Sequence, residues 1–215
     1  MSYPSTLDSC GLRNWATRAV GELAHRREEI NALNVFPVPD SDTGSNMAHT
    51  MEAAVAELDK GDDVADSLAR GAVRGARGNS GMVLSQVLRG VAESTVDSVI
   101  DGSVFARSLQ QAVELVDLAI AEPVEGTVIT VLRAAAEAAD DSAARPGATL
   151  HGIVSGAISA ARTALERTPS QLPALQEAGV VDAGGAGLVI LLESLLAEIE
   201  GSTGHAGLPV SYTHL

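Results

Sequence analysis

Apolar residues recur along most of the chain at the three- and four-residue spacing of an amphipathic helix. Near the amino end, Leu12, Trp15 and Ala19 share one helical face, and charged residues occupy the others. Further runs of this kind follow, separated by short stretches rich in glycine, proline or polar residues. Residues 140–147 are expected to form a loop and residues 168–173 a turn, and no strand is expected. The pattern predicts about eight helices, over residues 7–31, 47–61, 62–75, 82–90, 101–121, 127–139, 149–167 and 188–199.

The composition favours an all-α fold. Hydrophobic residues make up 46% of the 215 positions but aromatic residues only 2%, so alanine, leucine, valine and glycine fill the apolar positions. Small side chains allow helices to approach closely. We expect one domain over residues 1–200. Residues 201–215 are unlike the rest and are expected to be a disordered or non-native tail.

The formal charge of -14 argues against nucleic acid and anionic membranes as partners, because the chain has no basic stripe. Charged residues occur near the amino end, where a signal peptide would be apolar. The longest apolar run near the carboxyl end, residues 186–192, is too short to span a bilayer. The single cysteine, Cys10, is expected to be an inert thiol in a reducing compartment. The expected location is therefore the cytoplasm.

The densest polar stretch of the chain, residues 34–47, reads NVFPVPDSDTGSNM. Its two prolines hold the first half extended, so helices should begin only after the stretch. Asp40 and Asp42 lie two positions apart on this stiff segment and can be directed at one point, which a divalent cation with oxygen ligands requires. The stretch therefore suggests a magnesium site. The alternative is a helix amino terminus capped by Asp or Ser, and one stretch can serve both roles.

Two glycine-rich junctions also lead into helices. Residues 75–81 read GARGNSG, and residues 182–187 read DAGGAG. Such a loop presents free backbone N–H groups to an anion, although an ordinary helix–helix turn also explains it. At the first junction, Arg77 and residues 79–80 could contact a phosphate. Because Lys60 is the only lysine, a lysine-based phosphate loop is excluded, and a bound polyphosphate would need metal ions, helix amino termini and backbone amides.

Four blocks, in order and at natural spacing, resemble those of a known family. They are residues 34–47, residues 75–90 (GARGNSGMVLSQVLRG), residues 123–127 (PVEGT) and residues 182–188 (DAGGAGL). Together they resemble the nucleotide-binding L subunits of dihydroxyacetone kinases, the DhaL-type domain, over about residues 7–200. Within that family, the chain is most similar to the amino-terminal domain of the ATP-binding subunit of bacterial fatty acid kinases.

The resemblance implies an antiparallel eight-helix barrel with ATP or ADP at one end and two magnesium ions between acidic side chains and the phosphates. It implies metal ligation by Asp40 and Asp42, with Asn34 at the position of a third ligand that is aspartate in dihydroxyacetone kinases. Ser41 departs from the glycine that is usual in the family, and it is strained by about 1 kcal/mol if its backbone needs a positive φ. By position, the nucleotide would be held by Thr43, Asn46, Asn79, Ser80, Gly81, Thr127, Asp182 and Gly184.

The implied function is phosphoryl transfer, with the transferring group positioned and neutralised by metals. In the fatty acid kinase branch, the acyl substrate arrives on a separate carrier protein, which docks through domains beyond this one. The alternatives are an L-type subunit of dihydroxyacetone kinase and a regulatory module that binds ADP without turnover. The catalytic base is unidentified: His49 is a candidate, with a surface histidine as the alternative. The phosphoryl acceptor and the oligomeric state, a homodimer included, stay open.

Overall fold

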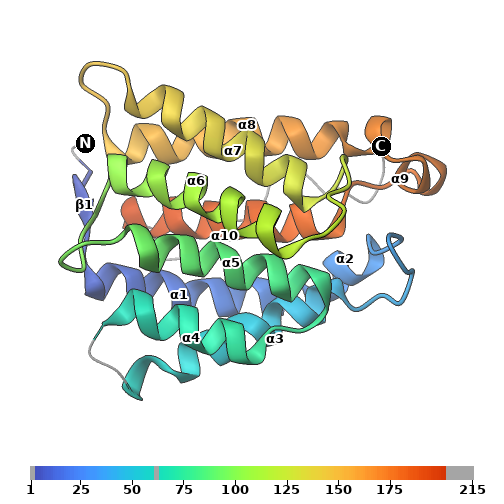
Figure 1. The fold of residues 1–215 in the computed structure, drawn as a ribbon, viewed down its shortest axis with the longest axis horizontal. Helices are drawn as coiled ribbons and strands as arrows, with labels where there is room; N and C mark the ends of the chain where they lie inside the picture. Colours follow the sequence, from blue (N-terminus) through green and yellow to red (C-terminus); the bar gives the residue numbers. More distant parts are fainter. Residues whose placement is uncertain (1–2, 61–62, 202–215) are drawn as a thin grey trace.

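The computed structural model describes residues 3–60 and 63–201 (Figure 1). These residues form ten α-helices, one 3₁₀ helix and one two-stranded sheet, so the all-α prediction is confirmed. The helices are α1 (Ser9–His25), α2 (Arg27–Ala32), α3 (Thr43–Ala56), α4 (Val64–Gly75), α5 (Gly78–Ser94), α6 (Gly102–Ala119), α7 (Val128–Ala143), α8 (Leu150–Gln171), α9 (Pro173–Ala178) and α10 (Ala183–Ile199). The 3₁₀ helix is η1 (Leu58–Lys60), and the strands are β1 (Thr6–Leu7) and β2 (Ile100–Asp101).

The eight long helices close into a barrel (Figure 1). Helices α1, α3, α4, α5, α6, α7 and α8 pack each on the next, and α10 packs between α8 and α1. The two remaining helices, α2 and α9, have only six residues each and lie at one end of the barrel. The predicted barrel of eight helices is therefore confirmed.

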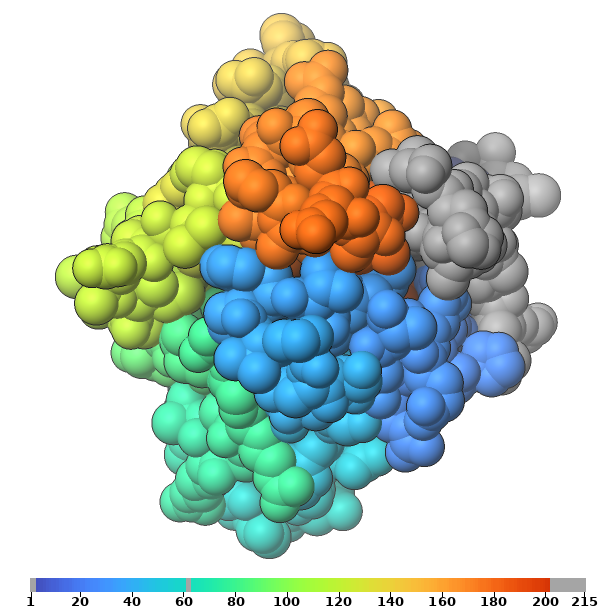
Figure 2. Space-filling model, turned by 90° about the vertical axis from the view of Figure 1, so that its right-hand side faces the viewer, coloured from blue at the N-terminus to red at the C-terminus, as the bar shows by residue number. Residues whose placement is uncertain are grey.

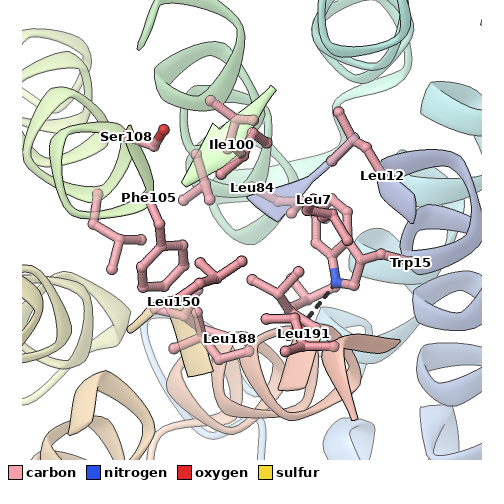
Figure 3. A pocket seen from close by; sticks show the side chains of 16 residues that line it. Leu7, Leu12, Trp15, Leu84, Ile100, Phe105, Ser108, Leu150, Leu188 and Leu191 are labelled. Carbon is pink, nitrogen blue, oxygen red and sulfur yellow. Dashed lines mark hydrogen bonds between the residues drawn. The ribbon is translucent and has the colours of Figure 1, made fainter. Parts of the chain in front are cut away.

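Apolar side chains fill the inside of the barrel. The indole N–H of Trp15 donates to the main-chain oxygen of Leu191 at 3.1 Å, which ties α1 to α10 within the core. A cavity of about 50 Å³ remains beside this contact, and its apolar wall includes Leu84, Phe105 and Leu188 (Figure 3). Among the described residues, no helix combines the length and the apolar character that crossing a membrane would need.

The single helix predicted over residues 7–31 is broken in the structure. Arg26 separates α1 from α2 with a backbone φ of -100° and ψ of 11°, outside the helical range. Its guanidinium forms a two-bonded ion pair with the Glu29 carboxylate, at 2.8 Å and 2.6 Å. This pair joins the residue at the break to the first turn of α2.

The predicted turn at residues 168–173 is wrong, because α8 continues through Pro169 to Gln171. A proline within a helix deprives the carbonyl four residues earlier of its N–H donor. Here that carbonyl belongs to Leu165, and the hydroxyl of Thr168 donates to it at 2.7 Å. The loop predicted at residues 140–147 is also shorter than expected, because α7 runs to Ala143.

Further differences from the prediction concern the start of α3, the strands and residues outside the described ranges. Helix α3 begins at Thr43, inside the polar stretch and before residue 47, where the sequence predicts the start of the second helix. Strands β1 and β2 pair antiparallel, whereas the sequence predicts no strand. A strand of two residues is too short to show an alternating pattern in the sequence. The predicted boundary between the second and third helices, at residues 61–62, lies outside the described residues, and so do residues 202–215 of the predicted tail.

Candidate functional site

A pocket of about 620 Å³ opens at the end of the barrel where α3, α5, α7 and α10 begin. Figure 2 faces this end, where the segment before α3, the α6–α7 link and α9 come together. Because backbone N–H groups of a first helical turn lack intrahelical partners, this end collects donors and the positive ends of four helix dipoles. All but one of the residues predicted to hold nucleotide or metal line this pocket: Asn34, Asp40, Asp42, Thr43, Asn46, Asn79, Ser80, Thr127, Asp182 and Gly184.

Gly81 is the exception. It is buried in α5 rather than on the pocket wall, and a Cβ at this position would come within 2.5 Å of the Thr50 hydroxyl oxygen on α3. The glycine therefore allows α5 to approach α3, and the same contact seats Gly78 and Asn79 at the pocket. Its place within the predicted motif reflects packing behind the site.

Asn34 organises the loop that carries the two aspartates. Its side-chain oxygen accepts the backbone N–H groups of Asp42 at 3.0 Å and Thr43 at 3.2 Å. Its side-chain nitrogen donates to the carbonyl oxygens of Phe36 at 3.4 Å and Val38 at 3.2 Å. Only 5% of Asn34 is exposed, so these bonds form away from water. Because the oxygen already accepts two N–H groups, we expect Asn34 to position the aspartates rather than to ligate a cation.

The carboxylates of Asp40 and Asp42 are left uncommitted. Asp42 occupies the N-cap position of α3, yet its side chain makes no capping hydrogen bond. Asn34 satisfies the Thr43 N–H instead, and Asn31 accepts the Ser45 N–H at 3.1 Å. Among the described residues, no hydrogen bond or ion pair involves the Asp40 or Asp42 carboxylate. The predicted capping role thus passes to two asparagines, which leaves both carboxylates free for a cation.

The backbone between the two aspartates is unusual. Ser41 has a φ of 54°, in the left-handed region that glycine occupies readily and other residues rarely adopt. The condition under which the sequence predicts strain at Ser41, a positive φ, is therefore met. The bend directs Asp40 and Asp42 toward the same pocket, whose wall both residues join.

The amino terminus of α5 forms the opposite side of the polar half of the pocket. Its N-cap residue, Arg77, makes no side-chain capping bond, so the first backbone N–H groups are available to a ligand. Gly78 has a φ of 60°, and a Cβ there would come within 2.7 Å of the Asn46 side-chain nitrogen. Glycine suits this position because it adopts the left-handed conformation without strain and leaves room for Asn46. Arg77 itself is absent from the pocket wall.

Asp182 joins two more helix amino termini. Its carboxylate accepts the Gly185 N–H at 2.7 Å and so caps α10, and it lies close to the backbone N–H of Val128, the first residue of α7. Burial raises the pKa of Asp182 to about 6, although the backbone hydrogen bonds from Gly185, Val128 and Gly184 act to lower it. Thr127 caps α7 through a 3.4 Å bond from the Ile129 N–H. These two residues fix the α7 and α10 ends of the pocket.

The charged side chains on the pocket wall are all carboxylates: Asp40, Asp42, Glu122 and Asp182. Among the described residues, no group of three or more His, Cys, Asp or Glu side chains could enclose a metal. The donor set nevertheless fits magnesium, which keeps several waters and binds through one or two carboxylates together with substrate phosphates. The pair formed by Asp40 and Asp42 is therefore the candidate metal-binding group.

The sequence indicates less of the apolar half of the pocket. Part of this wall comes from Ala119, the last residue of α6, and from the link to α7, which supplies Ile120, Ala121 and Val124. No periodic signal marks residues 119–122, and the resemblance covers only residues 123–127 of this segment. His49, the candidate base, does not line the pocket.

The fold and the pocket define a helical barrel with a ligand site at one end. The chain belongs to the DAK2 domain family, whose sequence model matches residues 37–197. The predicted relationship to the DhaL-type domain is thereby confirmed. Protein YloV of Bacillus subtilis (strain 168) is 37% identical over 204 residues, which cover 92% of this chain and 37% of that protein.

Solved structures show the same fold. The dihydroxyacetone kinase of C. freundii in its native form matches with a TM-score of 0.62 and 18% identity, covering 86% of this chain and 34% of that chain. The same kinase in complex with AMP-PNP and Mg²⁺ matches with a TM-score of 0.61 and 18% identity, covering 86% and 33%. This chain thus spans about a third of the length of the relatives it matches.

Proposed function

We propose that this chain binds ATP and ADP together with two magnesium ions and serves as the nucleotide domain of a kinase. The observation that carries the proposal is the placement of two uncommitted carboxylates, Asp40 and Asp42, on the same pocket as the uncapped amino terminus of α5. Membership of the DAK2 domain family and the AMP-PNP and Mg²⁺ in the similar kinase structure support it.

The charge of the pocket favours a metal-bound nucleotide over a free one. A bare polyphosphate would be repelled by a wall whose charged side chains are carboxylates. Asp40 and Asp42 would hold the cations, with water and phosphate oxygens as the other ligands. Magnesium held there would supply positive charge to neutralise the transferring phosphoryl group. The aspartates are thus ligands rather than bases.

The two halves of the pocket suggest how the nucleotide lies. Phosphates would lie between the Asp40 loop and the first turn of α5, where Asn79, Ser80 and backbone N–H groups donate to oxygen. Asn46 and Thr43 face the same polar half from α3. The base and sugar would lie against the α6–α7 link and the amino termini capped by Thr127 and Asp182. This orientation places the transferring phosphate at the aspartates.

Calorimetry tests the nucleotide proposal. Wild-type protein should bind ADP in magnesium buffer and lose this binding when EDTA removes the metal. Asp40→Asn or Asp42→Asn should weaken ADP binding in magnesium at least about a hundredfold, because each removes a charged metal ligand at little cost in volume. Asp141→Asn, a matched change on the exposed end of α7, should leave it unchanged. Wild-type affinity in both site variants would rule out the metal assignment.

As acceptor, we propose the carboxylate of a fatty acid presented by a separate carrier protein. A carboxylate is already ionised at neutral pH, so its attack on phosphorus needs no proton acceptor. This suits a pocket wall whose titratable side chains, among the described residues, are the carboxylates of Asp40, Asp42, Glu122 and Asp182, and from which His49 is absent. The carrier would dock through parts of a longer protein, since this chain spans 37% of its relative YloV.

A second candidate is the L-type subunit of a dihydroxyacetone kinase, which the fold match to that kinase favours. Incubation with ATP, magnesium and either acceptor separates the two. Acyl phosphate formed from fatty-acid-loaded carrier supports the first, whereas phosphorylation of dihydroxyacetone supports the second. Tight ADP binding without either product would indicate a regulatory module that binds nucleotide without turnover.

A further inference from the structure

One arginine connects the end of α6 to the link that forms part of the apolar half of the pocket. The link begins after Ala119, where α6 ends, and reaches Val128, where α7 begins. Arg133 lies in the second turn of α7 and is outside the pocket wall. Its guanidinium donates to the Asp117 carboxylate in the last turn of α6 at 2.7 Å, and to Glu125 in the link at 2.6 Å.

A second set of bonds secures the same carboxylate. The other oxygen of Glu125 accepts the hydroxyl of Thr130 at 2.6 Å, and that hydroxyl accepts the Gly126 N–H at 2.9 Å. Thr127 donates its hydroxyl to the Val124 carbonyl at 2.7 Å. The carboxyl-terminal part of the link is thus tied to the first turns of α7, and Arg133 connects this assembly to α6.

The planar fork of arginine suits this position. Its two terminal nitrogens bond two carboxylates on separate segments at once, whereas the single ammonium of a lysine is a point charge without that fixed geometry. The three side chains are partly exposed, 31% for Arg133, 60% for Glu125 and 41% for Asp117. Exposed pairs of this kind add little to global stability, so their main effect is local order in the link.

We propose that Arg133 is a positioning residue that orders the base-binding half of the pocket from outside it. This inference rests on the proposed binding of a nucleotide. If the link already has one conformation before the ligand binds, no conformational entropy of the link is lost on binding, and the affinity is higher. The phosphate-binding half, formed by the Asp40 loop and α5, has its own supports in Asn34 and Gly78 and does not depend on Arg133.

Two probes separate these halves. Replacing Arg133 with methionine keeps the aliphatic stem and removes the fork, and it should raise the Kd of ADP in magnesium by about tenfold. Binding of inorganic pyrophosphate in magnesium, which engages the phosphate half alone, should stay unchanged. Arg133→Lys should recover part of the loss. Arg145→Met, at an exposed arginine after α7, is the matched control and should affect neither probe.

A coupling test identifies the partner. Glu125→Gln alone should weaken ADP binding, but it should add nothing to Arg133→Met, because one interaction cannot be removed twice. Hydrogen exchange of peptides covering residues 119–127 should be faster in Arg133→Met, with the rest of the barrel unchanged. This readout needs no ligand.

Equal loss of ADP and pyrophosphate binding, or no loss of either in Arg133→Met, would overturn the proposal. Unchanged hydrogen exchange in the link would overturn it as well. A wild-type protein that binds neither probe would instead contradict the proposed function. The exchange result would then decide by itself whether Arg133 orders the link.

Discussion

The side-chain oxygen of Asn34 caps the helix on which Asp42 would otherwise act as the cap. It accepts the N–H groups of Asp42 and Thr43, at 3.0 Å and 3.2 Å, and Asn31 accepts the Ser45 N–H, so the Asp42 carboxylate makes no capping bond. Asn34 stands at the position where the family resemblance implies a metal ligand, but its side-chain oxygen is occupied by backbone N–H groups. The Asp42 carboxylate is the group left free for a cation.

Replacement of Asn34 tests whether it positions or ligates. Asn34→Ala removes the cap and should lower the unfolding free energy by about 1 to 2 kcal/mol and weaken magnesium-dependent ADP binding. Asn34→Asp restores a charged oxygen but faces it toward the carbonyl oxygens of Phe36 and Val38, so ADP binding should again weaken. Calorimetry that shows tighter ADP binding in Asn34→Asp would instead identify position 34 as a metal ligand.

Ser41 stores backbone strain that glycine would remove. Ser41→Gly should raise the unfolding free energy by about 1 kcal/mol, because glycine adopts a positive φ without steric cost. Ser41→Ala keeps a Cβ and should bring no such gain. Urea denaturation of both variants measures the difference, and equal stability of the glycine and alanine variants would contradict the strain at this position.

Thr168 supports both a proline-containing helix and the pocket. Its hydroxyl donates to Leu165 and accepts the Asp182 N–H at 3.1 Å, and the residue is fully buried. Thr168→Val keeps the shape but leaves both groups unsatisfied, so it should lower the unfolding free energy by about 2 to 3 kcal/mol. Thr168→Ser retains the hydroxyl and should cost less. Comparable losses in the two variants would assign the effect to packing instead.

Asp182 should make stability depend on pH. Its folded pKa of about 6 exceeds the usual 3.8, so the native state binds a proton more readily than the unfolded chain. This contribution to stability is largest below the unfolded pKa and is lost as pH rises through about 6. From pH 7 to pH 5, wild type should gain about 1 kcal/mol relative to Asp182→Asn in urea denaturation. A constant difference between the two proteins would contradict the raised pKa.

Local chemistry explains which parts of the site the sequence predicts. The polar residues of 34–47, 75–81 and 182–187 stand together in the chain, and each block contains or begins at a helix amino terminus. A position within one of these blocks does not by itself place a residue on the pocket wall: Gly81 packs against Thr50 instead. For Asn34, the sequence predicts a place at the pocket. Its hydrogen bonds to the Asp42 and Thr43 N–H groups depend on the conformation of the loop, which residue spacing does not predict.

The missed features depend on contacts between distant residues. The apolar wall from Ala119 to Val124 exists only because the α6–α7 link folds over the barrel end. Pro169 reads as a helix terminator because its missing N–H is visible in the sequence, whereas the compensating Thr168 hydroxyl is visible only in the structure. The break at Arg26 has no helix-breaking residue to mark it in the sequence.

Trp15 is an intrinsic fluorescent probe of unfolding. It is the only tryptophan in the sequence, 6% exposed and packed against α10. Its fluorescence should therefore shift to longer wavelength when the barrel opens and water reaches the indole. Since Trp15 is absent from the pocket wall, bound nucleotide would register as a higher denaturation midpoint instead of a quenched signal. Unlabelled protein thus suffices for every denaturation experiment described above.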